Sequence, residues 1–202
     1  IGADKNSVAD YAVSKAYGEQ AVLEAVPGAV VLRASVIFGP EDRFFNRFAS
    51  LARFTPVMPL IGGGETKFQP VYVGDVAEAI VAALDGKAKP GAVYELGGPQ
   101  VKSFRSLIEY VLQETARTRV PLNIPFWLAR IQASFLQVLP MAPLTIDQLN
   151  LLQYDNVVSE KAIREGRTLA GLGITPTAFE SIAPSYLYRY RKHGQFERAR
   201  SA

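Results

Sequence analysis

The sequence contains no cysteine and only one histidine, His193. Without cysteine there can be no disulfide, no thiolate metal site and no cysteine nucleophile. A single histidine excludes a multi-histidine metal site and argues against a Ser-His-Asp triad. We therefore predict no metal site and no triad-type hydrolase chemistry.

Long apolar runs and a strong charge of one sign are also missing. The nearest candidate for a membrane-spanning helix, 126–139, is interrupted by Arg130 and two glutamines, and falls short of the roughly 20 residues that spanning requires. The net charge of +3 is too mild to indicate nucleic acid, so no nucleic-acid partner is expected. The start, Ile1, is neither an initiator methionine nor followed by the apolar core of a signal peptide, and we expect it to lie in the middle of a longer protein.

The first half of the sequence alternates between helix-like and strand-like patterns. The stretch 29–38 is β-branched or apolar on both faces, which is typical of a strand buried in a parallel sheet. Helix-opening residues precede three of the predicted helices: a Ser7–Asp10 capping box, Asp75 and Ser103. The predicted helices are 7–26, 44–54, 76–84 and 104–115, and the predicted strands are 29–38, 68–73 and 92–96.

The second half is broken by prolines into short segments, with helices predicted at 126–139, 145–154 and 178–191. These patterns indicate an α/β fold class: the C-terminal part of a Rossmann-type, doubly wound parallel sheet plus a smaller, mainly helical lobe. We place the sheet, with insertions, in 1–115 and the helical lobe in 116–202.

Tyr11 and Lys15 are four residues apart on the first predicted helix, so both side chains lie on one face, one turn apart. A nearby ammonium stabilises a phenolate, and such a phenol can exchange a proton with a carbonyl or an alcohol. The spacing alone is weak, because Tyr188 and Lys192 have the same spacing in a basic tail where no site is expected. An isolated pair of this kind is more often a surface pair than a catalytic one.

The residues downstream of Tyr11 and Lys15 separate this pair from the one in the tail. The next strand reads Arg-Ala-Ser-Val-Ile-Phe-Gly-Pro over 33–40, and later stretches read Gln-Pro-Val-Tyr-Val-Gly-Asp-Val-Ala over 69–77 and Tyr-Glu-Leu-Gly-Gly over 94–98. In this order the features resemble the extended short-chain dehydrogenase/reductase family, in its NAD-dependent epimerase/dehydratase branch. The resemblance covers about residues 7–115.

This resemblance implies roles for individual residues. Tyr11 would be the catalytic acid/base, and Lys15 would hold the nicotinamide ribose. Ala34, Ser35 and Val36, together with Phe38, would border the nicotinamide of NAD(P). Ala34 replaces the family's usual proline and Phe38 its usual tyrosine.

The family's glycine-rich phosphate turn has no counterpart here, because Gly62-Gly63-Gly64 precedes a strand and not a helix. That turn and the family's catalytic Ser or Thr would fall before Ile1. We therefore expect NAD(P) to be bound by the full-length protein and weakly or not at all by these 202 residues alone.

Within the family, the stretches 38–48, 59–64, 172–176 and 183–191 resemble the nucleotide-binding accessory subunits of respiratory complex I and their bacterial relatives. That group implies complex I subunits as partners and a structural or assembly role for the nucleotide. It also implies a cytoplasmic protein, peripheral at the inner face of the membrane.

Two further segments admit two interpretations each. The tail 186–202 has five Lys or Arg residues against one Glu. It is either a patch for anionic lipid, RNA or an acidic partner subunit or, as we favour, a solvated helix end. The segment 126–139 either lies on a membrane surface with Trp127 at the interface or, as we favour, packs the helical lobe.

Two functions of different class remain open: a structural complex I-associated protein, and an active NAD(P)-dependent epimerase, dehydratase or reductase acting on a sugar nucleotide or another small carbonyl compound. The enzyme predicts a pocket above Tyr11 with polar groups from Asn46, Arg47 and Gln69 contacting the substrate. The structural protein predicts that aromatic side chains close this pocket, namely those of Phe44, Phe45 and Phe68.

Overall fold

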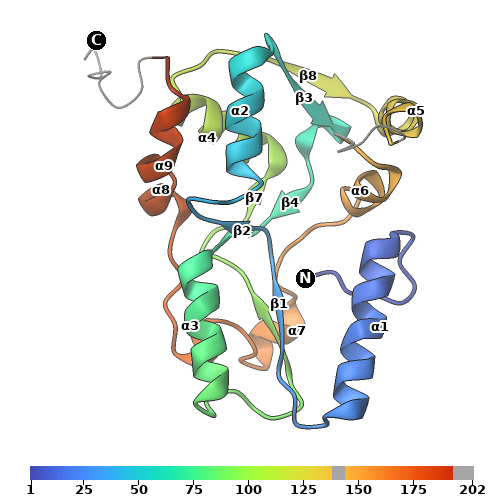
Figure 1. Cartoon of the computed structure of the whole chain (residues 1–202), viewed down its shortest axis with the longest axis vertical. Coiled ribbons are helices and arrows are strands. Elements are labelled where there is room, and N and C mark those ends of the chain that lie inside the picture. Colours follow the sequence, from blue (N-terminus) through green and yellow to red (C-terminus); the bar gives the residue numbers. More distant parts are fainter. Residues whose placement is uncertain (138–143, 193–202) are drawn as a thin grey trace.

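The computed structural model describes residues 1–137 and 144–192 and shows an α/β fold in two connected parts (Figure 1). In the lower part of the view, β1 (Val31–Ala34) pairs in parallel with β6 (Val93–Leu96). Helix α1 (Asp10–Ala25) lies on one side of this pair and α3 (Val73–Leu84) on the other. The predicted fold class is confirmed by these parallel strands and flanking helices.

Three more two-stranded pairs lead into the upper part. β2 (Ile37–Phe38) is parallel to β5 (Val71–Tyr72), and β4 (Lys67–Phe68) is antiparallel to β7 (Lys102–Ser103). β3 (Val57–Ile61) is parallel to β8 (Val120–Ile124). The remaining elements are α2 (Phe45–Phe54), η1 (Gly62–Gly64), α4 (Phe104–Glu114), α5 (Phe126–Leu136), α6 (Ile146–Leu151), α7 (Glu160–Arg164), η2 (Ala170–Leu172), α8 (Phe179–Ile182), α9 (Pro184–Leu187) and η3 (Tyr188–Tyr190).

The buried side chains form separate clusters, and the two larger ones draw on residues from both sides of residue 115. The upper cluster is aromatic and joins Phe38 and Phe45 to Phe179 and Leu187. The lower cluster packs Leu96 of β6 against Leu169. A small third cluster holds α5 against α6 through Ala129, Ala133 and Leu149.

The stretch predicted as one strand, 29–38, is two strands, because the chain changes partner in the middle. The Ser35 amide still donates to Leu96 O at 2.9 Å, whereas the carbonyl of Val36 accepts from the Val71 amide at 2.9 Å. The strand therefore leaves β6 and joins β5. Its side chains before the switch belong to the lower part and those after it to the upper part.

Strands β3 and β8 were not predicted, and both contain a proline. Pro59 lies opposite Leu122, and Met58 lies opposite Pro121. Proline cannot donate a ladder hydrogen bond and is tolerated only where the neighbouring side of the strand is unpaired. A two-stranded pair offers such a side on each strand.

The helix caps were predicted with mixed success. The Ser103 hydroxyl accepts from the Ser106 amide at 3.2 Å and caps α4, as predicted. The prediction for Asp75 is wrong: α3 begins at Val73, and the Asp75 carboxylate instead binds the amide and hydroxyl of Thr177 at 2.7 and 2.8 Å. The Ser7 capping box is also wrong, because α1 begins at Asp10 without a local side-chain cap.

The last predicted helix, 178–191, is likewise interrupted. Pro184, which has no amide hydrogen to donate, begins a new helix, so the segment divides into α8, α9 and η3. The predicted helix 126–139 is seen as α5 up to Leu136, and its last two residues lie outside the described ranges. Among the described residues, no helix has the length and apolar character needed to cross a membrane.

Candidate functional site

Tyr11 and Lys15 lie in the first two turns of α1, at the end of the helix that faces the upper part of the molecule. The Lys15 ammonium lies 5.4 Å from the centre of the Tyr11 ring. Tyr11 is 55% exposed and lines a cavity together with Val36, which follows β1. The phenol of the predicted pair therefore borders a cavity at the carboxyl end of the central strand.

The start of α1 is held by α6, a helix from the far end of the sequence. The Asp147 carboxylate accepts hydrogen bonds from the amides of Asp10 and Tyr11 at 2.6 and 3.2 Å. The buried Asn150 side chain donates to Val8 O at 3.0 Å. Asp147 thus supplies the acceptor that Ser7 was predicted to supply, and its negative charge suits the positive end of a helix dipole.

A second contact joins the middle of α1 to the sheet. The Arg33 guanidinium on β1 donates to both carboxylate oxygens of Glu19, with its shortest contact at 2.5 Å. This hydrogen bond is the main cause that raises the pKa of Arg33. Glu95, opposite Arg33 on β6, lies 3.9 Å from the same group. The two anchors together fix both the position and the tilt of the helix that carries Tyr11.

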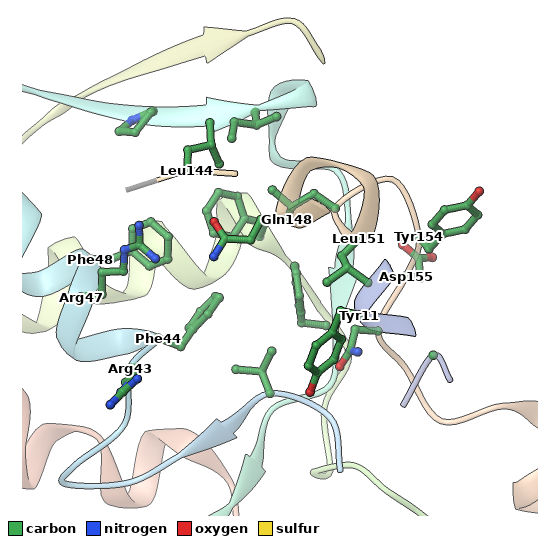
Figure 2. A pocket seen from close by; sticks show the side chains of 18 of the residues that line it. Tyr11, Arg43, Phe44, Arg47, Phe48, Leu144, Gln148, Leu151, Tyr154 and Asp155 are labelled. Atoms are coloured by element: carbon green, nitrogen blue, oxygen red, sulfur yellow. The ribbon is translucent and has the colours of Figure 1, made fainter. Parts of the chain in front are cut away.

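The cavity beside Tyr11 has a volume of about 1020 Å³ (Figure 2). Its walls come from α1, α2, β3, β4, α4, β8, α5 and α6. Most of the wall is aliphatic or aromatic, including Phe48, Leu51, Ile61, Ile124, Leu144 and Leu151. Of the charged lining residues, Arg43 and Arg47 lie near α2 and Asp155 lies on the side away from them, and Asp4 also lines the cavity.

Only some of the residues predicted to border a nicotinamide have side chains that can reach a ligand in the cavity. Val36 lines the cavity, and Ala34 is half-buried at the end of β1. The Ser35 hydroxyl is buried and donates to the side chain of Asn156 at 2.6 Å. Phe38 is fully buried in the aromatic cluster, 5.6 Å from the ring of Tyr72. Ser35 and Phe38 can therefore offer only backbone atoms to a ligand.

The three predicted substrate contacts lie in different places. Arg47 lines the cavity. The Asn46 amide donates to Pro40 O and Asp42 O at 3.1 and 3.0 Å, which holds the loop before α2. The Gln69 side chain bridges Gly98 O and the Val158 amide at 2.8 and 2.9 Å. Neither Asn46 nor Gln69 is among the lining residues.

The aromatic side chains do not close the cavity. Phe44 and Phe68 line it, with ring centres 5.8 Å apart, whereas Phe45 is fully buried behind them. Phe44 and Phe68 thus form part of the cavity wall and leave the cavity unfilled. No local sequence signal pointed to Arg43 or to the α6 residues as parts of this wall, because they join the cavity only through tertiary packing.

Two stretches that shared a resemblance, 38–48 and 183–191, contact one another. The Tyr186 hydroxyl donates to the Asp42 carboxylate at 2.6 Å. Arg189 donates to the side-chain oxygen of Asn46 at 2.6 Å. The loop before α2 is therefore shaped by the end of the chain, 144 residues away.

Helix α5 packs against α6 in the helical lobe, as favoured, but through small side chains and not through its large apolar ones. The helix buries Ala129 and Ala133, while Trp127, Ile131 and Phe135 are 66%, 50% and 76% exposed. The alternative, a contact at a membrane surface, stays a prediction. The basic tail also stays one, because 193–202 lies outside the described ranges.

Residues 3–99 match the profile of the 3-beta hydroxysteroid dehydrogenase/isomerase family. The chain is 36% identical to NADH dehydrogenase [ubiquinone] 1 alpha subcomplex subunit 9, mitochondrial, of Arabidopsis thaliana, across 96% of the chain and 50% of that protein. It is 33% identical to the Mus musculus protein of the same name, across 89% of the chain and 47% of that protein. The chain thus spans about half the length of these relatives.

Among solved structures, dTDP-glucose 4,6-dehydratase from Streptomyces venezuelae, crystallised with NAD and TYD bound, superposes with a TM-score of 0.61 at 18% identity. The match covers 89% of this chain and 50% of that one. At this identity the likeness shows the fold alone.

Proposed function

Because the chain belongs to the extended short-chain dehydrogenase/reductase family, in its NAD-dependent epimerase/dehydratase branch, we propose that the intact protein is a nucleotide-binding accessory subunit of a respiratory NADH dehydrogenase complex. In this proposal NAD(P) is held as a structural group. Its partners are the other subunits of the complex.

The observation that carries this proposal is the extent of the likeness to the complex I subunits. The family profile ends at residue 99. The Arabidopsis thaliana relative matches 96% of the chain, which includes the helical lobe that contains α5, α6 and α9. The likeness therefore extends beyond the family profile into this lobe, which supports a shared role.

Tyr11, Lys15 and Val36 suit a nicotinamide nucleotide. Both polar side chains are exposed at the carboxyl end of β1, where nucleotides lie in doubly wound sheets. Lys15 would donate to the ribose hydroxyls, and Val36 would offer an apolar surface to the ring. When bound, the nucleotide supplies a hydride acceptor or donor. We place the phosphate-binding glycines in the part of the protein that precedes Ile1.

The alternative function is an active NAD(P)-dependent epimerase, dehydratase or reductase. The open cavity beside Tyr11 favours it, because a purely structural protein has no need of one. Tyr11 would then be the acid/base, with Lys15 stabilising its phenolate and Arg47 contacting the substrate. The apolar wall around the cavity suits a sugar nucleotide poorly.

Two substitutions in the intact protein separate these functions. For the structural protein, Lys15→Met is expected to lower the content of co-purified nucleotide and the yield of assembled complex, because it removes the cation that holds the ribose. Tyr11→Phe is expected to leave both unchanged. Tyr17→Phe is the matched control, since Tyr17 is 57% exposed on the same helix and does not line the cavity.

The readouts are nucleotide released on denaturation and complex assembly in native electrophoresis. The structural role is refuted if Lys15→Met loses the nucleotide and the complex still assembles in full. The enzyme is supported if Tyr11→Phe keeps the nucleotide and loses NAD(P)-dependent turnover of a carbonyl substrate.

A further inference from the structure

The cavity beside Tyr11 is large for a small-molecule site. Its volume of about 1020 Å³ lies at the upper end of the range of about 300–1,000 Å³ that is usual for ligand pockets. Away from Tyr11, Figure 2 shows Phe48 and Leu144 in the wall, with Arg47 beside Phe48. Leu136, Ile61 and Ile124 also line the cavity. Most of the wall that a ligand would contact is therefore hydrocarbon, with Arg47 and Gln148 among its polar groups.

The polar and charged lining residues include Arg43, Arg47, Gln132 and Gln148. Arg43 precedes α2 and lines the same cavity as Tyr11, and the two side chains lie apart in Figure 2. In the part of the chain that the structure describes, the Arg43 guanidinium makes no hydrogen bond or ion pair with another residue. A guanidinium at the rim of an apolar cavity pairs well with a carboxylate, which it binds in a bidentate manner.

The acidic residues of the lining do not neutralise this cation. The Asp155 carboxylate accepts from the Lys67 amide at 2.8 Å and lies across the cavity from Arg43. The Asp4 carboxylate accepts from the Asn6 amide at 2.9 Å. Both carboxylates are engaged by backbone amides, so the charge at the α2 side of the mouth is positive.

From the apolar depth and the cationic rim, we propose that this cavity binds a long-chain fatty acid. The hydrocarbon chain lies among Phe48, Leu144 and Leu151, and the carboxylate lies at Arg43. The inference adds a ligand class to the site of the proposed function. It rests on that function only for the expectation that a nucleotide lies on the Tyr11 side.

Chain length is the first test. Hexadecanoate, kept below its micellar concentration, is titrated into the intact protein by calorimetry, and octanoate is titrated in the same way. Because each buried CH₂ adds to the hydrophobic driving force, hexadecanoate is expected to bind at least about 100-fold more tightly than octanoate. Equal affinities would overturn the proposal, since the additional CH₂ groups of hexadecanoate would then make no contact with the apolar wall.

The head group is the second test. Arg43→Glu is expected to weaken hexadecanoate binding by at least about 10-fold and to leave hexadecanol binding unchanged. Arg53→Glu is the matched control, because Arg53 is exposed on α2 and absent from the lining. An equal effect of the two substitutions, or hexadecanol binding as tightly as hexadecanoate to the unaltered protein, would contradict a carboxylate at Arg43.

Filling the cavity is the third test. Leu151→Trp and Leu144→Trp each replace an aliphatic side chain of the cavity wall with a bulkier indole. Each is expected to weaken hexadecanoate binding at least about 10-fold. Leu84→Trp, on an 82% exposed residue of α3, is the control. Unchanged binding in both folded cavity variants, with the fold checked by circular dichroism, would overturn the proposal.

Nucleotide content is measured on the same samples, so that the two proposals fail separately. Hexadecanoate binding without nucleotide or complex assembly would refute the proposed function and leave the fatty-acid site standing. Nucleotide and assembly without hexadecanoate binding would refute the fatty-acid site alone. A zwitterionic lysophospholipid that binds more tightly than hexadecanoate would also refute it, in favour of a phospholipid site.

Discussion

The carboxylate of Asp147 accepts a hydrogen bond from the backbone amide of Tyr11 at 3.2 Å, although 136 residues separate the two in sequence. The same carboxylate accepts from the Asp10 amide at 2.6 Å. The first turn of α1 is therefore capped by α6, and the orientation of the predicted acid/base depends on the helical lobe.

We predict that Asp147→Ala destabilises the protein by about 0.5–2 kcal/mol, because two amides at the start of α1 lose their acceptor and the helix dipole loses a compensating charge. The free energy of unfolding in urea measures this. Asp147→Asn, which keeps an acceptor oxygen, is expected to cost less. Asp85→Ala, at an exposed carboxylate after α3, is expected to change stability by less than about 0.5 kcal/mol. Equal effects at the two positions would show that the cap contributes nothing.

Two tyrosines of the aromatic cluster, the buried Tyr186 and the partly buried Tyr110, allow a matched test of this cluster. The Tyr186 hydroxyl donates to Asp42, whereas the Tyr110 hydroxyl is buried without a partner among the described residues. Tyr186→Phe is expected to lower the free energy of unfolding by about 1–3 kcal/mol, since the Asp42 carboxylate loses a hydrogen-bond donor. Tyr110→Phe is expected to be neutral or stabilising, because it removes an unpaired polar group. Denaturant unfolding of both variants measures this, and the opposite order would contradict the assigned contacts.

The same two residues predict a loss of stability at alkaline pH. Burial, followed by the hydrogen bond to Asp42, raises the pKa of Tyr186, and burial raises the pKa of Tyr110. The native state therefore holds both protons more tightly than the unfolded chain. Their contribution is complete below the unfolded pKa of about 10 and is lost as the pH rises further, by up to about 1.4 kcal/mol per pH unit for each group.

Unfolding free energies between about pH 8 and pH 11 check this prediction. The double variant Tyr186→Phe, Tyr110→Phe is expected to lose less stability over that range than the unaltered protein. Tyr154→Phe is the control, because Tyr154 is 57% exposed. A double variant with the same alkaline slope as the control would contradict the burial of the two phenols.

Glycine substitutions test the junction between β6 and β5. A Cβ on Gly98 would lie 1.9 Å from Pro70 O, a backbone atom that cannot move aside. Gly98→Ala is therefore expected to cost more than about 2 kcal/mol. Gly18→Ala is the control, because nothing lies within 4 Å of a Cβ added there, and alanine is favoured over glycine within a helix by about 1 kcal/mol. Thermal unfolding of both variants measures the contrast.

Local patterns were sufficient for the elements that carry the predicted pair. Apolar periodicity and the Pro-Gly break located α1, and the β-branched run located β1, so Tyr11 and Lys15 could be placed at a sheet edge. The same rules failed at β3 and β8, because Pro59 and Pro121 conceal strands whose pairing tolerates a missing donor.

The rest of the site depends on contacts that leave no local trace. In the sequence, Asp147 is indistinguishable from any acidic residue in the first turn of a short helix. Its contact with α1 arises only from the tertiary fold. Asn46 and Gln69 were plausible substrate contacts by position, yet neighbouring carbonyls and amides engage their side chains. Arg43 escaped notice because its place in the cavity wall depends on how α2 packs across from α6.

The anchoring of α1 has a consequence for recognising proteins of this kind. The profile that matches residues 3–99 contains the tyrosine and lysine but stops 48 positions short of the carboxylate at Asp147. A homologue can therefore retain the signature residues while the helix that carries them is no longer held in place. In surveys of such chains, the identity of the residue equivalent to 147 should distinguish a correctly oriented phenol from one that only matches the motif.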